Sequence, residues 1–433
     1  MKWASSICGP DGLNATSDDL SSAIGDCLYS LRTKLAASSV TGGEERARAD
    51  IITVGEERAR ADQIDLLIGF VTPHFADLYA DIPRMIAEQE PAFKGVFIGC
   101  SAAGLIGGGQ EIEQQPCIAF TAAHLPNVSI KPFYLSDAML PASTSSKEEY
   151  EQKIGVIDSD NPSFILLPDP FSFRLDEFLH GIDQHFPESV KLGGLASGAH
   201  APGGNALFMN DRAFNSGLVG VALSGNIVVD TVVAQGCKPI GSPHVITRAQ
   251  RHILFELDAE PAIMVLKRTI DGLSGFDLEL AKEAIFLGLV MDESKDDYQA
   301  GDFLIRNILG IEQTTGALVI GEVLDKTLTV QFHIRDAATS ADDLRFLLKE
   351  YKEQHVDNAQ SEVRGALLFS CLGRGAQLYG RANHDSDCFR DYLGPLPIGG
   401  FFCNGEIGPV GRSTYIHGYT SSFGIFREKE SRC

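Results

Sequence analysis

The side chains best suited to chemistry lie toward the C-terminus, in a glycine-rich stretch and in two short polar segments. Glu406 stands in GFFCNGEIGPVG (400–411), an apolar turn where an ionised carboxylate is costly unless it is paired. Such a group could receive a ligand amine, or accept backbone amides of its own turn. Arg374 or Arg412 would suit a ligand carboxylate through two parallel hydrogen bonds. Together these residues would make a site complementary to an amino acid.

The segment NHDSDCF (383–389) adds an asparagine and a histidine to these candidates. Asp385 or Ser386 is expected to cap the short helix that follows, which explains one polar residue but not the histidine. A neighbouring His–Asp pair can donate to a ligand carboxylate or act as a base. Asn383 and His384 are therefore predicted to contact a ligand, and a catalytic use of His384 stays open.

Three cysteines, Cys100, Cys371 and Cys403, each end an expected buried strand. A buried cysteine that forms no disulfide usually behaves as a small hydrophobic residue. Arg374 follows Cys371 by three residues and would lower the pKa of that thiol if both faced one cleft. A reactive thiol or a Cys/His metal site needs several side chains to meet in space, which the spacing in the sequence does not indicate. We therefore expect no metal.

A glycine-rich pattern recurs three times, in 93–125, 190–225 and 396–426. Each copy runs from an apolar strand through glycine, small or polar residues and a glycine-rich turn into another strand, which indicates one supersecondary unit used at least three times. Glycine permits close backbone approach, and successive exposed amides form an anion-binding concavity. The alternative is that these glycines serve tight corners and sheet packing. The polar residues predicted to line a pocket are Cys100, Ser101, Ser197, Asn404 and Glu406. Cys371, Arg374 and Cys403 are predicted to bind the ligand as well.

Hydrophobic periodicity predicts an α/β fold of the layered α+β kind, with mixed and antiparallel sheets flanked by helices. Short apolar runs such as 65–71 and 163–169 read as buried strands, and 174–186 reads as an amphipathic helix. In 217–236 two strands surround a Ser-Gly-Asn turn, which predicts a hairpin. Helix 261–273 and the strands within 303–335 continue the pattern.

Two related domains are expected, at 63–240 and 241–428. Residues 1–62 are interpreted as an N-terminal extension, which holds the start of a twelve-residue tandem duplication (43–66). Two copies are too few for a stacked repeat fold, so the duplication is expected to lengthen a solvated segment.

Composition narrows the range of partners and compartments. The formal net charge is −22 and no dense block of Lys and Arg occurs, which argues against nucleic acid as a partner. No apolar run reaches the length of a membrane span, and no signal peptide is recognisable, so membrane insertion is not expected. The nine cysteines are scattered without a CxxC pair, a pattern typical of reduced thiols in a cytoplasmic protein.

Common catalytic and cofactor motifs are absent from the sequence, which contains no P-loop, HExxH, EF-hand loop or GxSxG elbow. The segment GRGAQLYG (373–380) resembles a dinucleotide turn but lacks the third glycine at the required spacing. No cofactor is expected, and an enzyme is the less favoured function.

Several long motifs, in order, resemble the FIST family (F-box and intracellular signal transduction) over about 63–426. GCSAAGLIGGGQEIE (99–113) resembles the FIST N-terminal domain. The resemblance to the FIST C-terminal domain is carried by 301–337, 365–375, 383–394 and 400–411.

This resemblance implies a sensory module that binds small ligands, amino acids among them, and signals to partner proteins. Some eukaryotic members carry an F-box, and bacterial members are often fused to transducer domains or stand alone. Residues 1–62 show no F-box-like pattern and no transducer segment follows residue 426, so a stand-alone bacterial-type member with a separate signalling partner is expected.

Two other functions stay open. The chain could be a protein-interaction scaffold without a ligand. It could also be an enzyme that uses Cys403, His384 or Glu406, in which case a pH profile would report those groups.

Overall fold

The computed structural model describes residues 1–9, 13, 16–37, 63–142, 145–295, 297–298, 301–324, 326–357 and 362–429. Nearly all of the tandem duplication lies outside these residues. The chain forms two compact units. Unit 1 comprises the described residues within Met1–Val233, Leu348–Ile416 and Ser421–Cys433, and unit 2 those within Ala234–Leu347 and His417–Thr420. No helix of the described part is both long and apolar enough to cross a membrane.

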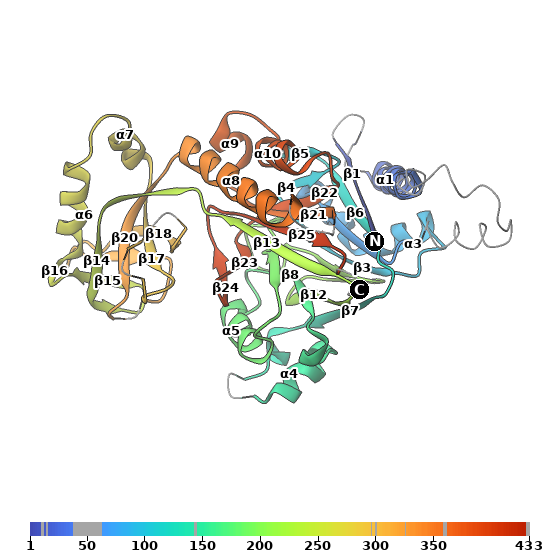
Figure 1. Cartoon of the computed structure of the whole chain (residues 1–433), viewed down its shortest axis with the longest axis horizontal. Helices are drawn as coiled ribbons and strands as arrows, with labels where there is room; N and C mark the ends of the chain where they lie inside the picture. The colour runs from blue at the N-terminus through green and yellow to red at the C-terminus, as the bar shows by residue number, and fades with distance from the viewer. Residues whose placement is uncertain are drawn as a thin grey trace. The chain divides into compact units, whose positions relative to one another are not determined.

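Unit 1 is built from three successive repeats with one order of elements: strand, helix, strand, helix, strand, hairpin, strand (Figure 1). The first repeat contains β1 (Lys2–Cys8), α1 (Ser17–Ala37), β2 (Leu66–Val71), the 3-10 helix η1 (Pro73–Asp81), α3 (Ile82–Gln89), β3 (Val96–Ser101), β4 (Gly104–Gly107), β5 (Gln110–Glu113) and β6 (Ile118–His124). The second contains β7 (Val128–Leu135), α4 (Lys147–Ile154), β8 (Ser163–Pro168), α5 (Leu175–His185), β9 (Lys191–Gly194), β10 (Leu207–Met209), β11 (Arg212–Phe214) and β12 (Leu218–Gly225).

The third repeat is interrupted after its first strand, because the chain of unit 2 is inserted there. It contains β13 (Val228–Ala234), α8 (Ala337–Tyr351), the π-helical turn η4 (Lys352–Val356), β21 (Val363–Cys371), α9 (Gly375–Tyr379), α10 (His384–Leu393), β22 (Ile398–Cys403), β23 (Glu406–Val410), β24 (Ser413–His417) and β25 (Ser421–Arg427). The boundary between the units falls within α8.

Each repeat contributes four strands to its own sheet and gives its hairpin to another sheet. The orders are β1-β6-β2-β3-β10-β11, β7-β12-β8-β9-β23-β24 and β13-β25-β21-β22-β4-β5. In each sheet one central pair is parallel (β2 with β3, β8 with β9, β21 with β22), and the neighbouring pairs are antiparallel. In Figure 1 the cyan strand β4 of the first repeat lies beside the red-orange β22 of the third. The mixed sheets flanked by helices confirm the predicted fold class.

The recurring glycines have a structural reason in this arrangement. A Cβ on Gly99, Gly193 or Gly400 would stand 1.8 to 2.0 Å from a carbonyl oxygen of the neighbouring parallel strand. No side chain fits at that distance, so all three repeats require glycine at the same place in the parallel pair.

The hairpin predicted for 217–236 is wrong. Both strands exist, as β12 and β13, but they belong to different sheets. The turn between them carries the chain from the second repeat into the third, because β12 is held between β7 and β8.

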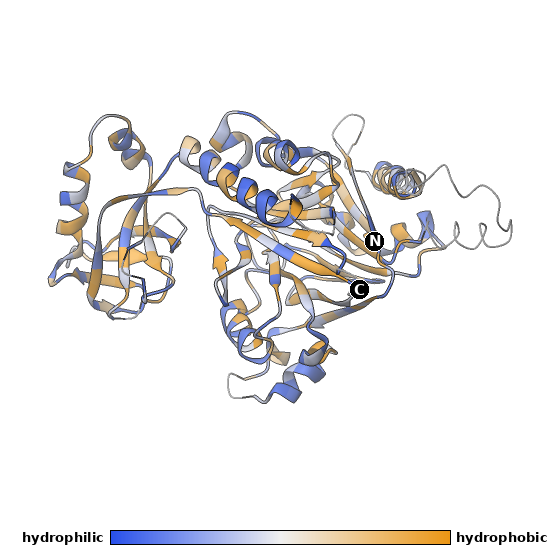
Figure 2. Ribbon diagram, in the orientation of Figure 1, coloured by the Kyte–Doolittle hydropathy of each residue, from blue (hydrophilic) through white to orange (hydrophobic). Residues whose placement is uncertain are grey.

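The largest core of unit 1 joins all three sheets, through residues such as Ile68, Val221 and Phe401. Trp3 of β1 stacks on Phe426 of β25, with ring centroids 4.2 Å apart, and so ties the first repeat to the third. Figure 2 shows apolar colour concentrated on these strands, whereas the helices carry both colours. The packing of strand faces and helix stripes is the expected main stabilising contribution.

Unit 2 contains one seven-stranded sheet in the order β14-β20-β17-β18-β19-β15-β16, which closes on itself because β14 also pairs with β15. Its elements are β14 (Cys237–Gln250), β15 (Ile253–Leu257), β16 (Glu260–Pro261), α6 (Ala262–Asp271), α7 (Gly275–Glu283), β17 (Ile285–Val290), β18 (Phe303–Ile311), β19 (Leu318–Ile320) and β20 (Thr329–Arg335).

Candidate functional site

The ends of the three glycine motifs contact one another within unit 1. The Ser197 hydroxyl donates to the carbonyl oxygen of Phe402 (2.5 Å) and accepts from the amide of Ala103 (3.0 Å). The side-chain amide of Asn404 donates to the carbonyl of Ala196 (3.2 Å). These hydrogen bonds join the motifs of all three repeats.

Ser101 and Cys100 are held in the protein interior. The Ser101 hydroxyl accepts from the amide of Ala206 (2.9 Å) and lies 3.3 Å from Asn205 Oδ1. Cys100 is fully buried in the core, and burial raises the pKa of its thiol well above the usual range. Both residues hold neighbouring segments of unit 1 together.

Glu406 and Cys403 form a second buried pair. Glu406 is fully buried on β23, opposite Gly194 of β9. Cys403 Sγ lies 3.3 Å from Glu406 Oε1 and 3.4 Å from the carbonyl oxygen of Ser370. Burial and then the negative charge of Glu406 raise the pKa of the Cys403 thiol, so it stays protonated and donates. Cys371, at the end of β21, is half-buried.

Arg374 forms a buried ion pair with Asp385, which lies in the first turn of α10. Arg374 is fully buried, with Nε 2.9 Å from Asp385 Oδ2 and Nη2 3.3 Å from Oδ1. Arg374 also donates to the hydroxyl of Tyr379 (2.5 Å), whose ring stacks on His384. His384 Nδ1 lies 2.8 Å from Asp385 Oδ1, and the hydroxyl of Ser421 donates to Asp385 Oδ2.

The electrostatics of this cluster fix its charges. Burial alone would raise the pKa of Asp385, but the charge of Arg374 and the donated hydrogen bonds outweigh it and hold that pKa well below its usual range. Burial likewise opposes the charge of Arg374, and Asp385 restores it. The pair is therefore ionised, and the guanidinium of Arg374 donates to the carboxylate of Asp385.

The predicted cap of α10 is wrong. The helix begins at His384, after Asn383 in a left-handed conformation (φ 63°), and neither Asp385 nor Ser386 caps it. The acceptor comes from another repeat instead. Glu111 Oε1 of β5 accepts from the Ser386 amide (2.7 Å), while the Asn383 side chain accepts from the Glu111 amide (2.6 Å).

Sequence reasoning missed the two acids of β5 that meet the third repeat. Glu113 Oε1 accepts from the amide of Ala376 at the start of α9 (2.8 Å). Burial, and then the charge of Asp385, raise the pKa of Glu111 to about 7. Both acids end the motif GCSAAGLIGGGQEIE that carries the family resemblance, but the motif does not indicate partners more than 260 residues away.

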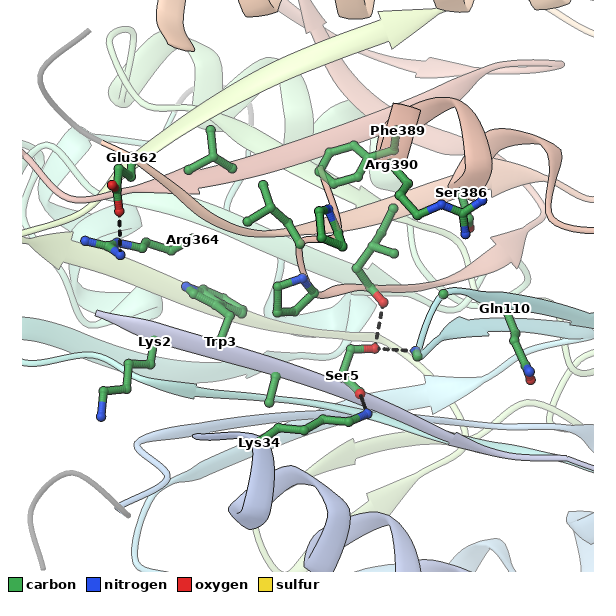
Figure 3. A pocket seen from close by; sticks show the side chains of 18 of the residues that line it. Lys2, Trp3, Ser5, Lys34, Gln110, Glu362, Arg364, Ser386, Phe389 and Arg390 are labelled. Carbon is green, nitrogen blue, oxygen red and sulfur yellow. Dashed lines mark hydrogen bonds and ion pairs between the residues drawn. The ribbon is translucent and has the colours of Figure 1, made fainter. Parts of the chain in front are cut away.

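A cavity of about 810 Å³ opens on the other side of α10, a volume that suits a small ligand (Figure 3). It is bounded by β1, the turn between β4 and β5, the start of β21, α10 and the segment before β22. Of the predicted site residues Asn383 lines it, and Ser386 of the same helix end lines it too. Its charged lining residues are Lys2, Lys34, Glu362, Arg364 and Arg390.

The structure thus places the predicted residues in three locations. Cys100, Ser101, Ser197, Cys403, Asn404 and Glu406 lie around the three glycine motifs, Arg374 and His384 lie in the buried cluster at the start of α10, and Asn383 lines the cavity. Within the described part of the chain, no group of three His, Cys, Asp or Glu side chains is arranged to hold a metal ion.

Comparisons with known proteins agree with the motifs. The FIST N domain model matches residues 65–260 and the FIST C domain model matches residues 262–409. An uncharacterised protein of Mycobacterium tuberculosis is 36% identical over 359 residues, which cover 82% of this chain and 88% of that protein. One of Mycobacterium bovis is 34% identical over 355 residues, 82% and 87% of the two chains.

Two further similarities are more limited. F-box only protein 22 of Homo sapiens is 48% identical over 42 residues, 10% of each chain. A crystal structure of cyanuric acid hydrolase from A. caulinodans covers 99% of this chain and 100% of its own, with 7% identity and a TM-score of 0.33. That superposition is too loose to carry an argument.

Proposed function

Because this chain belongs to the FIST family, whose domains are associated with sensing and signal transduction, we propose that it binds a small molecule and reports the bound state to a separate protein. Amino acids and related metabolites are the first ligands to test. We also propose a cytoplasmic location, which the scattered cysteines without a CxxC pair favour.

The observation that carries this proposal is the cavity beside α10. It combines a volume of about 810 Å³, within the range of small-molecule sites, with a wall of both apolar and polar side chains. Segments of the first and third repeats line it together, so a ligand there would bridge two repeats.

Helix α10 gives the site a means of response. Its residues Asn383, Ser386 and Phe389 line the cavity, while His384 and Asp385 belong to the buried cluster on the helix's other side. A ligand that shifts α10 would therefore act on the Arg374–Asp385 ion pair. A population shift of this kind needs only a difference in ligand affinity between two positions of the helix.

Trp3 is the only tryptophan in the chain and lines the cavity, so under native conditions its fluorescence is a probe of this site. We would titrate the full-length protein with amino acids and related metabolites, following Trp3 emission and the midpoint of thermal unfolding. A ligand at about a hundred times its Kd adds about 2.7 kcal/mol of stability, which raises the midpoint by several degrees.

Two asparagine variants locate the site. Asn383→Gly, which keeps the left-handed backbone, should weaken binding, whereas Asn404→Gly should not, because Asn404 lies at the glycine motifs. The reverse result would move the ligand to those motifs. If no compound changes either signal and no ligand co-purifies, the sensor proposal fails and an interaction scaffold takes its place. Turnover of a bound compound would instead establish an enzyme.

A further inference from the structure

We propose that the cavity beside α10 takes a small organic anion, with a carboxylate or phosphate group next to an apolar body. This inference rests on the proposed function, since it names the ligand class of the same site. It follows from three observations on the cavity wall and one comparison within the molecule.

The first observation is the charge of the wall. Lys2, Lys34, Arg364 and Arg390 line the cavity and Glu362 is the one carboxylate among its lining residues, although the whole chain carries a net charge of −22. Four cations gathered around one hollow of an acidic protein give it a local positive potential that favours an anion.

The second observation is that donors in this wall lack acceptors. Trp3 is 4% exposed, and its Nε1 has no hydrogen-bond partner among the described residues. The same holds for Nε of Arg364, whose Nη1 pairs with Glu362 at 2.9 Å. Trp3 packs on Gly365, the residue that follows Arg364 in β21, where a Cβ would come within 2.7 Å of Trp3 Cβ. Buried donors without acceptors are costly, and a ligand oxygen would satisfy them if the two side chains turn to admit it.

The remaining cations already have partners within the protein, and they contribute to the positive potential of the cavity. Lys34 Nζ donates to the carbonyl oxygen of Ser5 (2.6 Å), and Arg390 pairs with Asp387 (2.7 Å). Trp3 and Arg364 are therefore the groups we expect to contact the anion directly, and Figure 3 shows both on the same side of the cavity.

The third observation is the apolar part of the wall, which excludes a bare ion as the natural occupant. Much of the cavity is faced by ring and aliphatic side chains, and its volume far exceeds that of a phosphate ion. The apolar side chains include Val363, Phe389, Pro395, Pro397 and Ile398.

The comparison is with the corresponding place in the first sheet. There a cavity of about 440 Å³ lies between α3, the segment before β3 and the turn between β10 and β11. Its charged lining residues are Glu90, Lys94 and Asp211, so the basic wall beside α10 is not imposed by the fold. The four lining cations are therefore specific to the cavity beside α10, as expected of residues that bind a ligand.

Four probes test the inference on the full-length protein by Trp3 fluorescence: benzoate, phenyl phosphate, inorganic phosphate and the neutral benzamide. We expect benzoate or phenyl phosphate to saturate the signal at least about tenfold more tightly than benzamide, and inorganic phosphate to bind more weakly than phenyl phosphate. Raising the ionic strength should weaken the binding of the anions and leave the affinity for benzamide unchanged. The ratio of benzoate to phenyl phosphate affinity tells carboxylate from phosphate.

Arg364→Gln should lower the affinity for the anions by about tenfold and leave benzamide within about twofold. The matched control is Arg84→Gln, an exposed arginine of α3 that pairs with Glu88 and lies outside both cavities. Equal changes in the two variants would overturn the inference.

The failures of the two proposals can be told apart. If benzamide binds as well as benzoate, or if the metabolite screen finds only neutral ligands, the cavity is a ligand site but not an anion site, and this inference alone fails. If neither probes nor metabolites change Trp3 emission, both proposals fail.

Discussion

The Arg374–Asp385 pair allows a quantitative test of the cluster under α10. Asp385→Asn keeps the shape of the side chain but removes the charge that compensates a fully buried guanidinium. Breaking one partner of a buried ion pair costs about 3–5 kcal/mol, because the other charge stays buried and uncompensated. Asn can still accept from Arg374 or from Ser421, so we expect a loss near the lower end, about 3 kcal/mol.

The assay is urea unfolding of the full-length chain followed by the emission of Trp3, which lies in unit 1 and therefore reports that unit. The double variant Arg374→Met/Asp385→Asn removes both charges. It should be more stable than the sum of the single losses predicts, by about 2 kcal/mol or more. A loss below about 1 kcal/mol for Asp385→Asn, or strictly additive losses, would refute the claim that these two charges depend on each other.

Three further predictions concern protons and glycine. The pKa of Glu111 is raised from 4.5 to about 7, so the folded state holds a proton that the unfolded state releases. Unit 1 should therefore lose about 3 kcal/mol of stability as pH rises from 4.5 through 7. Urea titrations at several pH values should show this loss in the wild type and not in Glu111→Gln. Burial lowers the pKa of His333 from 6.5 to about 4, so unit 2 should lose stability as pH falls from 6.5 toward 4, and calorimetric scans should show no such loss in His333→Gln. Gly193→Ala should lower the unfolding free energy by more than about 3 kcal/mol, because its Cβ would stand 1.9 Å from the carbonyl oxygen of Leu166. The control Gly310→Ala should change the unfolding free energy by less than about 1 kcal/mol, because nothing lies within 4 Å of its Cβ.

Local patterns predicted most elements but not their partners. Apolar runs located β2, β8 and β21, because a buried strand needs consecutive apolar residues. The three glycine motifs indicated a repeated unit, because close backbone approach requires glycine at the same place in each repeat. The hairpin predicted for 217–236 is wrong because a Ser-Gly-Asn turn reports only that the chain reverses. Which strand it then pairs with depends on edges left open elsewhere in the fold, here by β25.

The site shows the same limit. Sequence reasoning proposed Arg374 and His384 as separate ligand contacts, and only the structure shows that both meet at Asp385. It assigned Asp385 to a cap, since Asp is common there, and could not foresee that Glu111 takes that role from another repeat. Lys2 and Trp3 carried no motif, and their importance comes only from the cavity that β1 borders.

The exchange of hairpins has a consequence for how the protein is made. The first sheet is completed when β10 and β11 are synthesised, but the second waits for β23 and β24, and the third for β25, close to the end of the chain. Until then the emerging polypeptide holds open strand edges, which invite pairing with other chains. Pairings that close them, such as β9 with β23, join strands far apart in the sequence, which makes folding slow. We therefore expect fragments that stop before residue 406 to aggregate on synthesis, and the full-length chain to depend on chaperones more than its length alone would suggest.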